Sequence, residues 1–167
     1  MEKSLSRVSH TFGAVYDKES RALILGTMPS PKSREQGFYY AHPQNRFWKV
    51  LASLYGEETP AGTESRKEFA LRHKIALWDV LAECDIRGAS DSSIKNPVPN
   101  DISALLSKTN VKAVFTTGNT ASKLYMKYIE PQTKVKAIAL PSTSPANARC
   151  SLDELLAAYA QIKEYTE

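Results

Sequence analysis

Residues 22–30 read ALILGTMPS, an apolar run that ends in a glycine and continues into a segment rich in Thr, Pro and Ser. Three further short runs share this apolar, partly β-branched character: Ile75–Val80, Val111–Thr117 and Val135–Leu140. All four are nearly continuously apolar rather than alternating, which is typical of parallel strands covered on both faces. They predict a parallel sheet in which Ala22–Gly26 is one of the buried strands.

Helical patterns lie between these runs. Phe47, Val50, Leu51 and Leu54 are spaced to give a helix with one apolar face. Further helices are expected at Ser65–Lys74, starting with Ser65 and Glu68, at Ile102–Leu106 after Asp101, at Ala121–Tyr128, and from Ser151, where Ser151 and Glu154 form a capping box. Strands that alternate with helices predict an α/β fold with helices on both faces of the sheet.

Ligands of such sheets bind outside the carboxyl ends of the strands. The segments that follow the predicted strands are therefore the expected place for chemistry: Thr27–Ser33, the residues from Asp79, Gly118–Asn119 and Pro141–Arg149.

Composition limits the class of protein. The 167 residues suit one domain, 1–167, and 42% hydrophobic and 24% charged residues are ordinary for a soluble globular chain. No apolar run approaches the roughly 20 residues that cross a bilayer, and the first residues lack a signal-peptide core, so we expect a cytoplasmic protein. Cys84 and Cys150 are expected to be reduced thiols. Two cysteines and three histidines are few candidate ligands for a metal ion, so no metal site is expected. The net charge of +4 is compatible with a polyanionic partner but is weak evidence alone.

Aromatic and amide side chains are concentrated between residues 38 and 48. The consecutive rings of Phe38, Tyr39 and Tyr40 cannot all face one way, so at least one should meet a cleft, where a flat ring can stack on a nucleobase. Asn45 precedes a predicted helix and is either its N-cap or a holder of water through its amide oxygen. Arg46 is either a solvated helix charge or a phosphate contact.

Other candidates are weaker. Gly26–Ser30 is either a phosphate-binding turn or a simple connection, and it has neither the P-loop nor the dinucleotide glycine spacing. Asp79, at the end of a predicted strand, either accepts a hydrogen bond from a base N–H or caps the following turn. The hydroxyls and prolines of Pro141–Arg149 suit phosphate contacts. Asp85, Asp91 and Asp101 are interpreted as turn or cap residues.

Three segments together resemble the uracil-DNA glycosylase superfamily, closest to its hypoxanthine-DNA (deoxyinosine) glycosylase branch. They are GTMPS at 26–30, GFYYAHPQNRFW at 37–48 and PSTSPAN at 141–147. The resemblance implies a three-layer α/β/α domain around a short, mostly four-stranded parallel sheet. It also implies an enzyme, without metal or cofactor, that flips a deaminated nucleotide out of DNA and hydrolyses its N-glycosidic bond in base-excision repair.

The resemblance also suggests residue roles. Met28 stands where many relatives carry a water-holding carboxamide, so Asn45 is expected to position the water. Tyr40, Asp79, Met28 and Gly26 are expected to bind the base. The residues expected to contact DNA are Ser30, Ser33, Arg46, Ser142, Ser144, Asn147 and Arg149, with Asn147 or Arg149 as the wedge that enters the duplex.

The predicted partner is DNA that contains a deaminated base. The protein is expected to be a monomer and not to associate with a membrane. Hypoxanthine is the expected base because of the resemblance, since an Asp79 carboxylate suits the N–H of either hypoxanthine or uracil. Three alternatives stay open: a uracil or G:U-mismatch glycosylase, a catalytically silent damaged-DNA-binding module, and an enzyme acting on free nucleotides.

Overall fold

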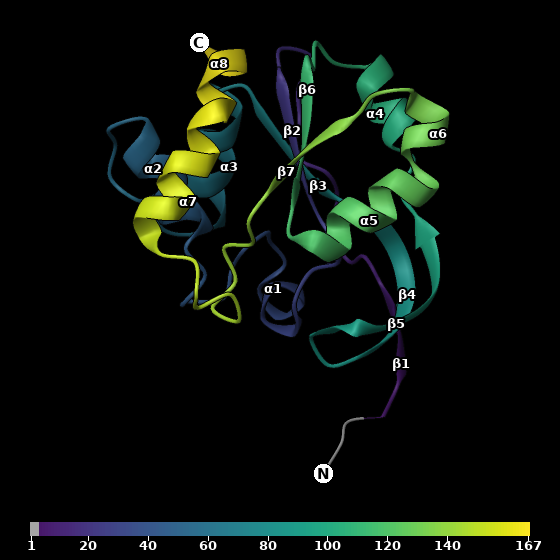
Figure 1. Cartoon of the computed structure of the whole chain (residues 1–167). Helices are drawn as coiled ribbons and strands as arrows, with labels where there is room; N and C mark the ends of the chain where they lie inside the picture. Colours follow the sequence, from purple (N-terminus) through teal and green to yellow (C-terminus); the bar gives the residue numbers. More distant parts are fainter. Residues whose placement is uncertain (1–3) are drawn as a thin grey trace.

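A four-stranded parallel sheet forms the centre of the computed structural model, which describes residues 4–167 (Figure 1). The strands are β2 (Ala22–Gly26), β3 (Ile75–Asp79), β6 (Ala113–Thr117) and β7 (Ala137–Leu140), in the order β3-β2-β6-β7. These are the four predicted strands, of which three are shorter by one or two residues at one end. Val135 lies outside β7 because its carbonyl accepts a hydrogen bond of 2.6 Å from the hydroxyl of Tyr125.

Helices cover both faces of this sheet (Figure 1). On one side lie α2 (Phe47–Leu54), α3 (Thr63–Arg72) and α7 (Leu152–Tyr159), followed by η1 (Ala160–Ile162) and α8 (Lys163–Thr166). On the other side lie α4 (Ile102–Ser107), α5 (Asn119–Tyr128) and α6 (Glu130–Thr133). The predicted α/β/α arrangement is confirmed. Within residues 4–167, no helix is long and apolar enough to span a membrane.

Burial on both faces of the sheet explains why the sequences of its strands are continuously apolar. Ala22 and Ile24 belong to the core under α2 and α7, whereas Leu23 and Leu25 belong to the core under α4 and α5, and all four are fully buried. Since successive side chains of a strand point to opposite faces, a strand covered twice must be apolar throughout.

A second sheet escaped the sequence analysis. Its antiparallel strands β1 (Ser6–Ser9), β4 (Leu81–Arg87) and β5 (Ser90–Pro99) are ordered β1-β4-β5. The interpretation of Asp85 and Asp91 as turn or cap residues is wrong, because Asp85 lies within β4 and Asp91 within β5. The β5 segment, SDSSIKNPVP, is largely polar and solvent-facing, so it lacks the apolar signal of a strand.

The helix starts follow the predicted capping only in part. Ser151 and Glu154 form the predicted capping box of α7, and Asp101 accepts the N–H of Ala104 as the N-cap of α4. The expected start of α3 at Ser65 is wrong, since that helix begins after Gly62 without a side-chain cap. A short helix, α1 (Pro31–Gln36), was not predicted, because the Pro-rich context indicated only a loop.

Candidate active site

A pocket of about 610 Å³ opens at the carboxyl ends of β2, β3 and β6, the edge of the sheet that the topology indicated. Four segments line it: the loop after β2, the Tyr39–Asn45 segment, the turn between β4 and β5, and the loop after β7. A volume of this size is typical of small-molecule and nucleobase sites.

Gly26 and Asp79 form the floor of the pocket, side by side at the ends of β2 and β3. A Cβ on Gly26 would lie 2.6 Å from Asp79 Oδ1, 3.4 Å from Tyr40 Oη and 3.6 Å from Thr117 Oγ1. A carboxylate oxygen and two hydroxyls therefore converge above a residue that has no side chain. Because a buried carboxylate repels phosphate, the interpretation of Gly26 as part of a phosphate-binding turn is not supported.

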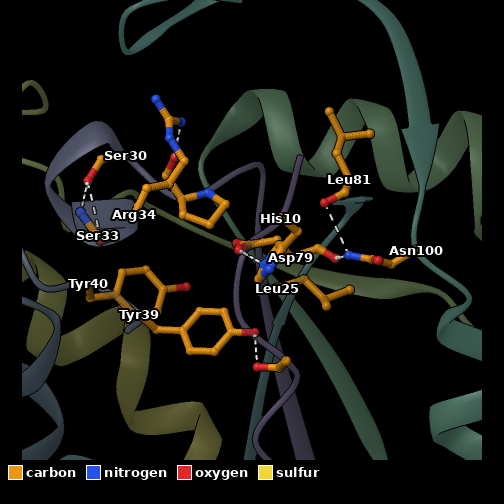
Figure 2. Close-up of polar contacts among 12 residues, drawn as sticks. His10, Leu25, Ser30, Ser33, Arg34, Tyr39, Tyr40, Asp79, Leu81 and Asn100 are labelled. Atoms are coloured by element: carbon orange, nitrogen blue, oxygen red, sulfur yellow. Dashed lines mark hydrogen bonds and ion pairs between the residues drawn. The ribbon is translucent and has the colours of Figure 1, made fainter. Parts of the chain in front are cut away.

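The side chain of Asp79 contacts the side chain of His10, a residue that the sequence analysis did not identify (Figure 2). His10 Nε2 lies 2.8 Å from Asp79 Oδ2, and the two side chains are 6% and 5% exposed. The backbone carbonyl of Asp79 accepts 2.9 Å from Asn100 Nδ2 (Figure 2). The alternative role of Asp79 as a turn cap receives no support, since no backbone N–H of the described residues donates to its carboxylate. No motif links positions 10 and 79, so only the fold reveals this pair.

Tyr40 is the more exposed of the two aromatic residues of the trio that line the pocket. Phe38 and Tyr39 are 4% and 2% exposed, and Tyr39 lines the pocket together with Tyr40, as the sequence indicated for at least one ring. The Tyr40 ring stacks on Phe47 with centroids 3.8 Å apart, so only its edge and opposite face are left for a base. Burial, followed by the charge of Asp79, raises the pKa of Tyr40, and its hydroxyl therefore stays protonated near neutral pH.

Tyr40 also has an unusual backbone. Its φ of 53° lies in the left-handed region, which is rare for an aromatic residue. Such conformations persist where the surrounding structure holds them, and they cluster at functional sites.

The amide oxygen of Asn45 is fully occupied. Oδ1 accepts the backbone N–H of Phe47 at 2.9 Å and the hydroxyl of Thr143 at 2.8 Å, which uses both lone pairs. In this structure the oxygen therefore has no free acceptor site, and the role of Asn45 in positioning a water stays a prediction. The alternative role as a helix cap is supported in part. Asn45 Oδ1 accepts a hydrogen bond from the first N–H of α2, although the N-cap residue of this helix is Arg46.

The amide nitrogen of Asn45 is the atom left for a ligand. Among residues 4–167 Nδ2 has no hydrogen-bond partner, and Asn45 lines the pocket. The opposite amide orientation would place NH₂ against the N–H of Phe47, so the backbone donor fixes which atom is the oxygen. Asn45 thus offers hydrogen-bond donors to the pocket, not an acceptor.

Arg46 holds the loop after β7. Its guanidinium donates to the carbonyl oxygens of Cys150 at 2.5 Å and Asn147 at 3.1 Å. In this structure Arg46 therefore supports the loop with two of its N–H groups, and its contact with a phosphate stays a prediction. Arg149, in contrast, is exposed and forms no ion pair with any described residue.

The polar side chains of the same loop mostly bind the loop itself. Asn147 Nδ2 donates to Ser142 O at 2.9 Å, which ties back one of the two expected wedge residues. Ser142 Oγ and Ser144 Oγ accept backbone N–H groups within the loop, and both residues line the pocket. The exposed tip that borders the pocket consists instead of Pro145 and Ala146.

Some of the residues after β2 hold the backbone of this segment in place, and others line the pocket. Ser30 caps α1 by accepting the N–H of Ser33, and Ser33 Oγ accepts the N–H of Ala41 at 3.2 Å (Figure 2). Ser33 is buried and lines the pocket, and its contact with DNA stays a prediction. Met28 lines the pocket and packs on the core under α5, so it supplies apolar surface.

Asp91 brings a second carboxylate to the pocket from the start of β5. Loss of solvent and then the charge of Asp79 raise the pKa of Asp91. Glu35 also lines the pocket, where it pairs with Lys32, so the buried Asp79 is the carboxylate that makes the floor of the pocket a poor site for a free phosphate group. Within residues 4–167, no group of three or more His, Cys, Asp or Glu side chains is arranged to hold a metal ion.

Tyr159 anchors the start of the loop after β7, because its buried hydroxyl donates to Pro141 O at 2.6 Å. Burial raises the pKa of Tyr159 well above its ordinary value of about 10. The folded state therefore retains this proton more strongly than the unfolded state, so the stabilisation is present below pH 10 and is lost as the pH rises further.

We expect Tyr159→Phe to lower the free energy of unfolding by about 1–3 kcal/mol at pH 7.5, since it leaves a buried carbonyl unpaired. The loss should be smaller at pH 10.5, where the wild type is itself weakened. Urea unfolding at both pH values measures this, with exposed Tyr16→Phe as the control. An equal loss at both pH values would contradict the assignment.

Comparison with known proteins identifies the scaffold. The family model of the uracil DNA glycosylase superfamily matches residues 13–163. The chain belongs to this superfamily. Two relatives, both named hypoxanthine DNA glycosylase, are 34% identical over 142 residues (Methanosarcina barkeri; 83% of this chain, 87% of the relative) and 32% identical over 148 residues (Methanosarcina acetivorans; 86% and 91%).

A solved structure of the superfamily has the same fold. The solution NMR structure of a Methanosarcina acetivorans protein, provisionally described as a uracil DNA glycosylase, superposes with a TM-score of 0.79. It is 28% identical, and the superposition covers 95% of this chain and 99% of that one. The superfamily resemblance and the fold class predicted from the sequence are thereby confirmed.

Proposed function

We propose that this chain is a monofunctional DNA glycosylase that releases hypoxanthine from deoxyinosine in DNA. The observation that carries the proposal is the pairing, in one pocket of a superfamily scaffold, of an acceptor, Asp79, with a donor, Asn45 Nδ2. Hypoxanthine presents an N1–H that suits the carboxylate and ring acceptors that suit the amide. The names of the two Methanosarcina relatives favour the purine over uracil.

The geometry suggests how the residues divide the reaction. A flipped base enters the pocket against the free side of the Tyr40 ring, and the unpairing cost is lowest for a damaged or mismatched base. As the C1′–N9 bond breaks, its electron pair moves onto the base, where donors aimed at the developing negative charge lower the barrier. Asn45 Nδ2 supplies such a donor, and water adds to C1′. The products are free hypoxanthine and an abasic site in an uncut strand.

Single-turnover release from matched duplexes containing deoxyinosine, deoxyuridine or neither tests this proposal. We expect release from deoxyinosine and none from the unmodified duplex. Release from deoxyuridine alone would move the specificity to the uracil or G:U-mismatch alternative. Salt-sensitive binding without any release would favour the silent DNA-binding module, the alternative that Met28 suggests. Action on free deoxyinosine monophosphate but not on DNA would favour a nucleotide enzyme, against which the buried Asp79 carboxylate argues.

The rest of the proposal concerns the protein's surroundings. We infer a single domain over residues 1–167 that acts as a cytoplasmic monomer in base-excision repair, without a metal or cofactor. Ser142 and Ser144 at the pocket rim, and Ser30 on α1, are proposed to lie along the DNA backbone. The exposed Pro145–Ala146 tip is proposed as the wedge, since small apolar side chains including proline can insert between bases.

Arg149 is expected to contact a DNA phosphate. We expect Arg149→Ala to weaken binding to damaged and undamaged duplexes alike and to reduce the slope of log K against log salt by about one. Fluorescence anisotropy titrations at several salt concentrations measure this. Lys112→Ala is the matched control, because Lys112 is exposed at the opposite, amino-terminal end of β6 and carries the same charge. An unchanged slope in Arg149→Ala would remove it from the interface.

A further inference from the structure

His10 is a buried titratable residue to which the mechanism above gives no role. It follows β1 directly, and its backbone N–H donates to Ala82 O at 2.7 Å, which fixes the segment beside β4. Its ring packs edge-on against Phe12 at 4.8 Å and tilted against Tyr39 at 5.8 Å. Buried in this way, the imidazole is aimed at a single polar group, Asp79 Oδ2, at 2.8 Å (Figure 2).

The surroundings of the ring indicate its protonation state. His10 Nδ1 is buried and has no hydrogen-bond partner among residues 4–167. A doubly protonated ring would bury an N–H without an acceptor, which is costly. A ring with its proton on Nε2 donates to the carboxylate and leaves an unpaired acceptor, instead of an unpaired N–H, at Nδ1.

This donor determines how the Asp79 carboxylate faces the pocket. With Oδ2 held by His10, Oδ1 lies above Gly26, and the hydroxyls of Tyr40 and Thr117 border the same space above this glycine. Burial raises the pKa of Tyr40, and the charge of Asp79 raises it further. The hydroxyl of Tyr40 is therefore a donor, and Asp79 Oδ1 is the pocket's anionic acceptor. A fixed anionic acceptor favours a base edge that carries N–H and repels one that carries a lone pair.

We propose that His10 is a positioning residue that determines base specificity: it holds Asp79 so that Oδ1 accepts the N1–H of hypoxanthine and rejects purines whose N1 is unprotonated. The inference rests on the proposed function, because it concerns the base that this pocket reads. His10 itself touches neither the base nor the sugar and acts only through Asp79.

Single-turnover release from duplexes containing deoxyinosine or purine 2′-deoxyriboside, whose N1 carries a lone pair, tests this role. We expect His10→Leu to lower the rate on deoxyinosine by about tenfold or more, as expected for a lost buried hydrogen bond to a charged group. The rate on the purine substrate should not fall, so the preference for deoxyinosine decreases. His10→Gln, whose Nε2 can still donate to Asp79, should restore most of the preference.

The controls separate positioning from packing. Phe12→Leu alters the ring beside His10 without touching the polar pair, and it should preserve the preference. If His10→Leu fails to fold, His10→Gln and the shorter His10→Asn replace it, since only Gln retains the reach. Equal preferences in Gln and Asn variants, or an unchanged preference in His10→Leu, would overturn the role of His10. A wild type that releases no hypoxanthine would instead overturn the proposed function.

Discussion

Asn45→Asp should release hypoxanthine about 100- to 1000-fold more slowly than the wild type, the usual cost of losing one well-placed donor to a developing anion. Aspartate retains an oxygen that can accept from Phe47 N–H and Thr143 Oγ1, so the start of α2 and the loop after β7 should stay in place. What changes is the atom that faces the pocket, from an NH₂ donor to a carboxylate oxygen. Single-turnover base release measures the effect.

The same substitution discriminates between two roles of Asn45. If the residue instead held the nucleophilic water through an oxygen, as the sequence suggested, Asn45→Asp would remain active or become faster. Gln44→Glu is the matched control, because Gln44 is an exposed neighbour and the change adds the same charge. Binding to undamaged DNA should be similar in the two variants, which separates a loss of chemistry from electrostatic repulsion.

Gly26→Ala should reduce base release by about 100-fold. The new methyl group would lie 2.6 Å from Asp79 Oδ1, a distance that forces the carboxylate to move. Since Oδ2 is bound by His10, the movement must break that hydrogen bond or turn Oδ1 away from the pocket. Overpacking of this kind typically costs about 1–3 kcal/mol of stability as well.

Base release and urea unfolding, both compared with Gly13→Ala, test this prediction. Gly13 has no atom within 4 Å of the position of a Cβ, so the control adds the same methyl group without a clash. Binding to undamaged duplexes should be unaffected in both variants, because the change lies at the floor of the pocket. A Gly26→Ala enzyme with wild-type release would show that the placement of Asp79 Oδ1 does not matter for the reaction.

The central sheet and the edge of the sheet that carries the pocket were predictable from the amino-acid sequence. The four strands were predictable because burial on both faces demands continuous apolar runs, a signal contained within each strand. Capping at Asp101 and Ser151 was predictable because the partners lie within one helical turn. The pocket edge followed from topology, since parallel strands place all their carboxyl ends together.

Which atoms face the pocket depends on contacts between segments that are distant in the sequence. The second hydrogen bond to Asn45 Oδ1 comes from Thr143, 98 residues away, and the orientation of Asp79 depends on His10, 69 residues away. The support that Arg46 gives to the loop after β7 could not be predicted either, because the carbonyls that it binds lie more than 100 residues further along. The polar strand β5 was equally hidden, since it is defined by its pairing with β4 and not by its own composition. Residue type and local spacing indicate which groups are available, but a hydrogen bond between distant segments exists only once packing has brought them together.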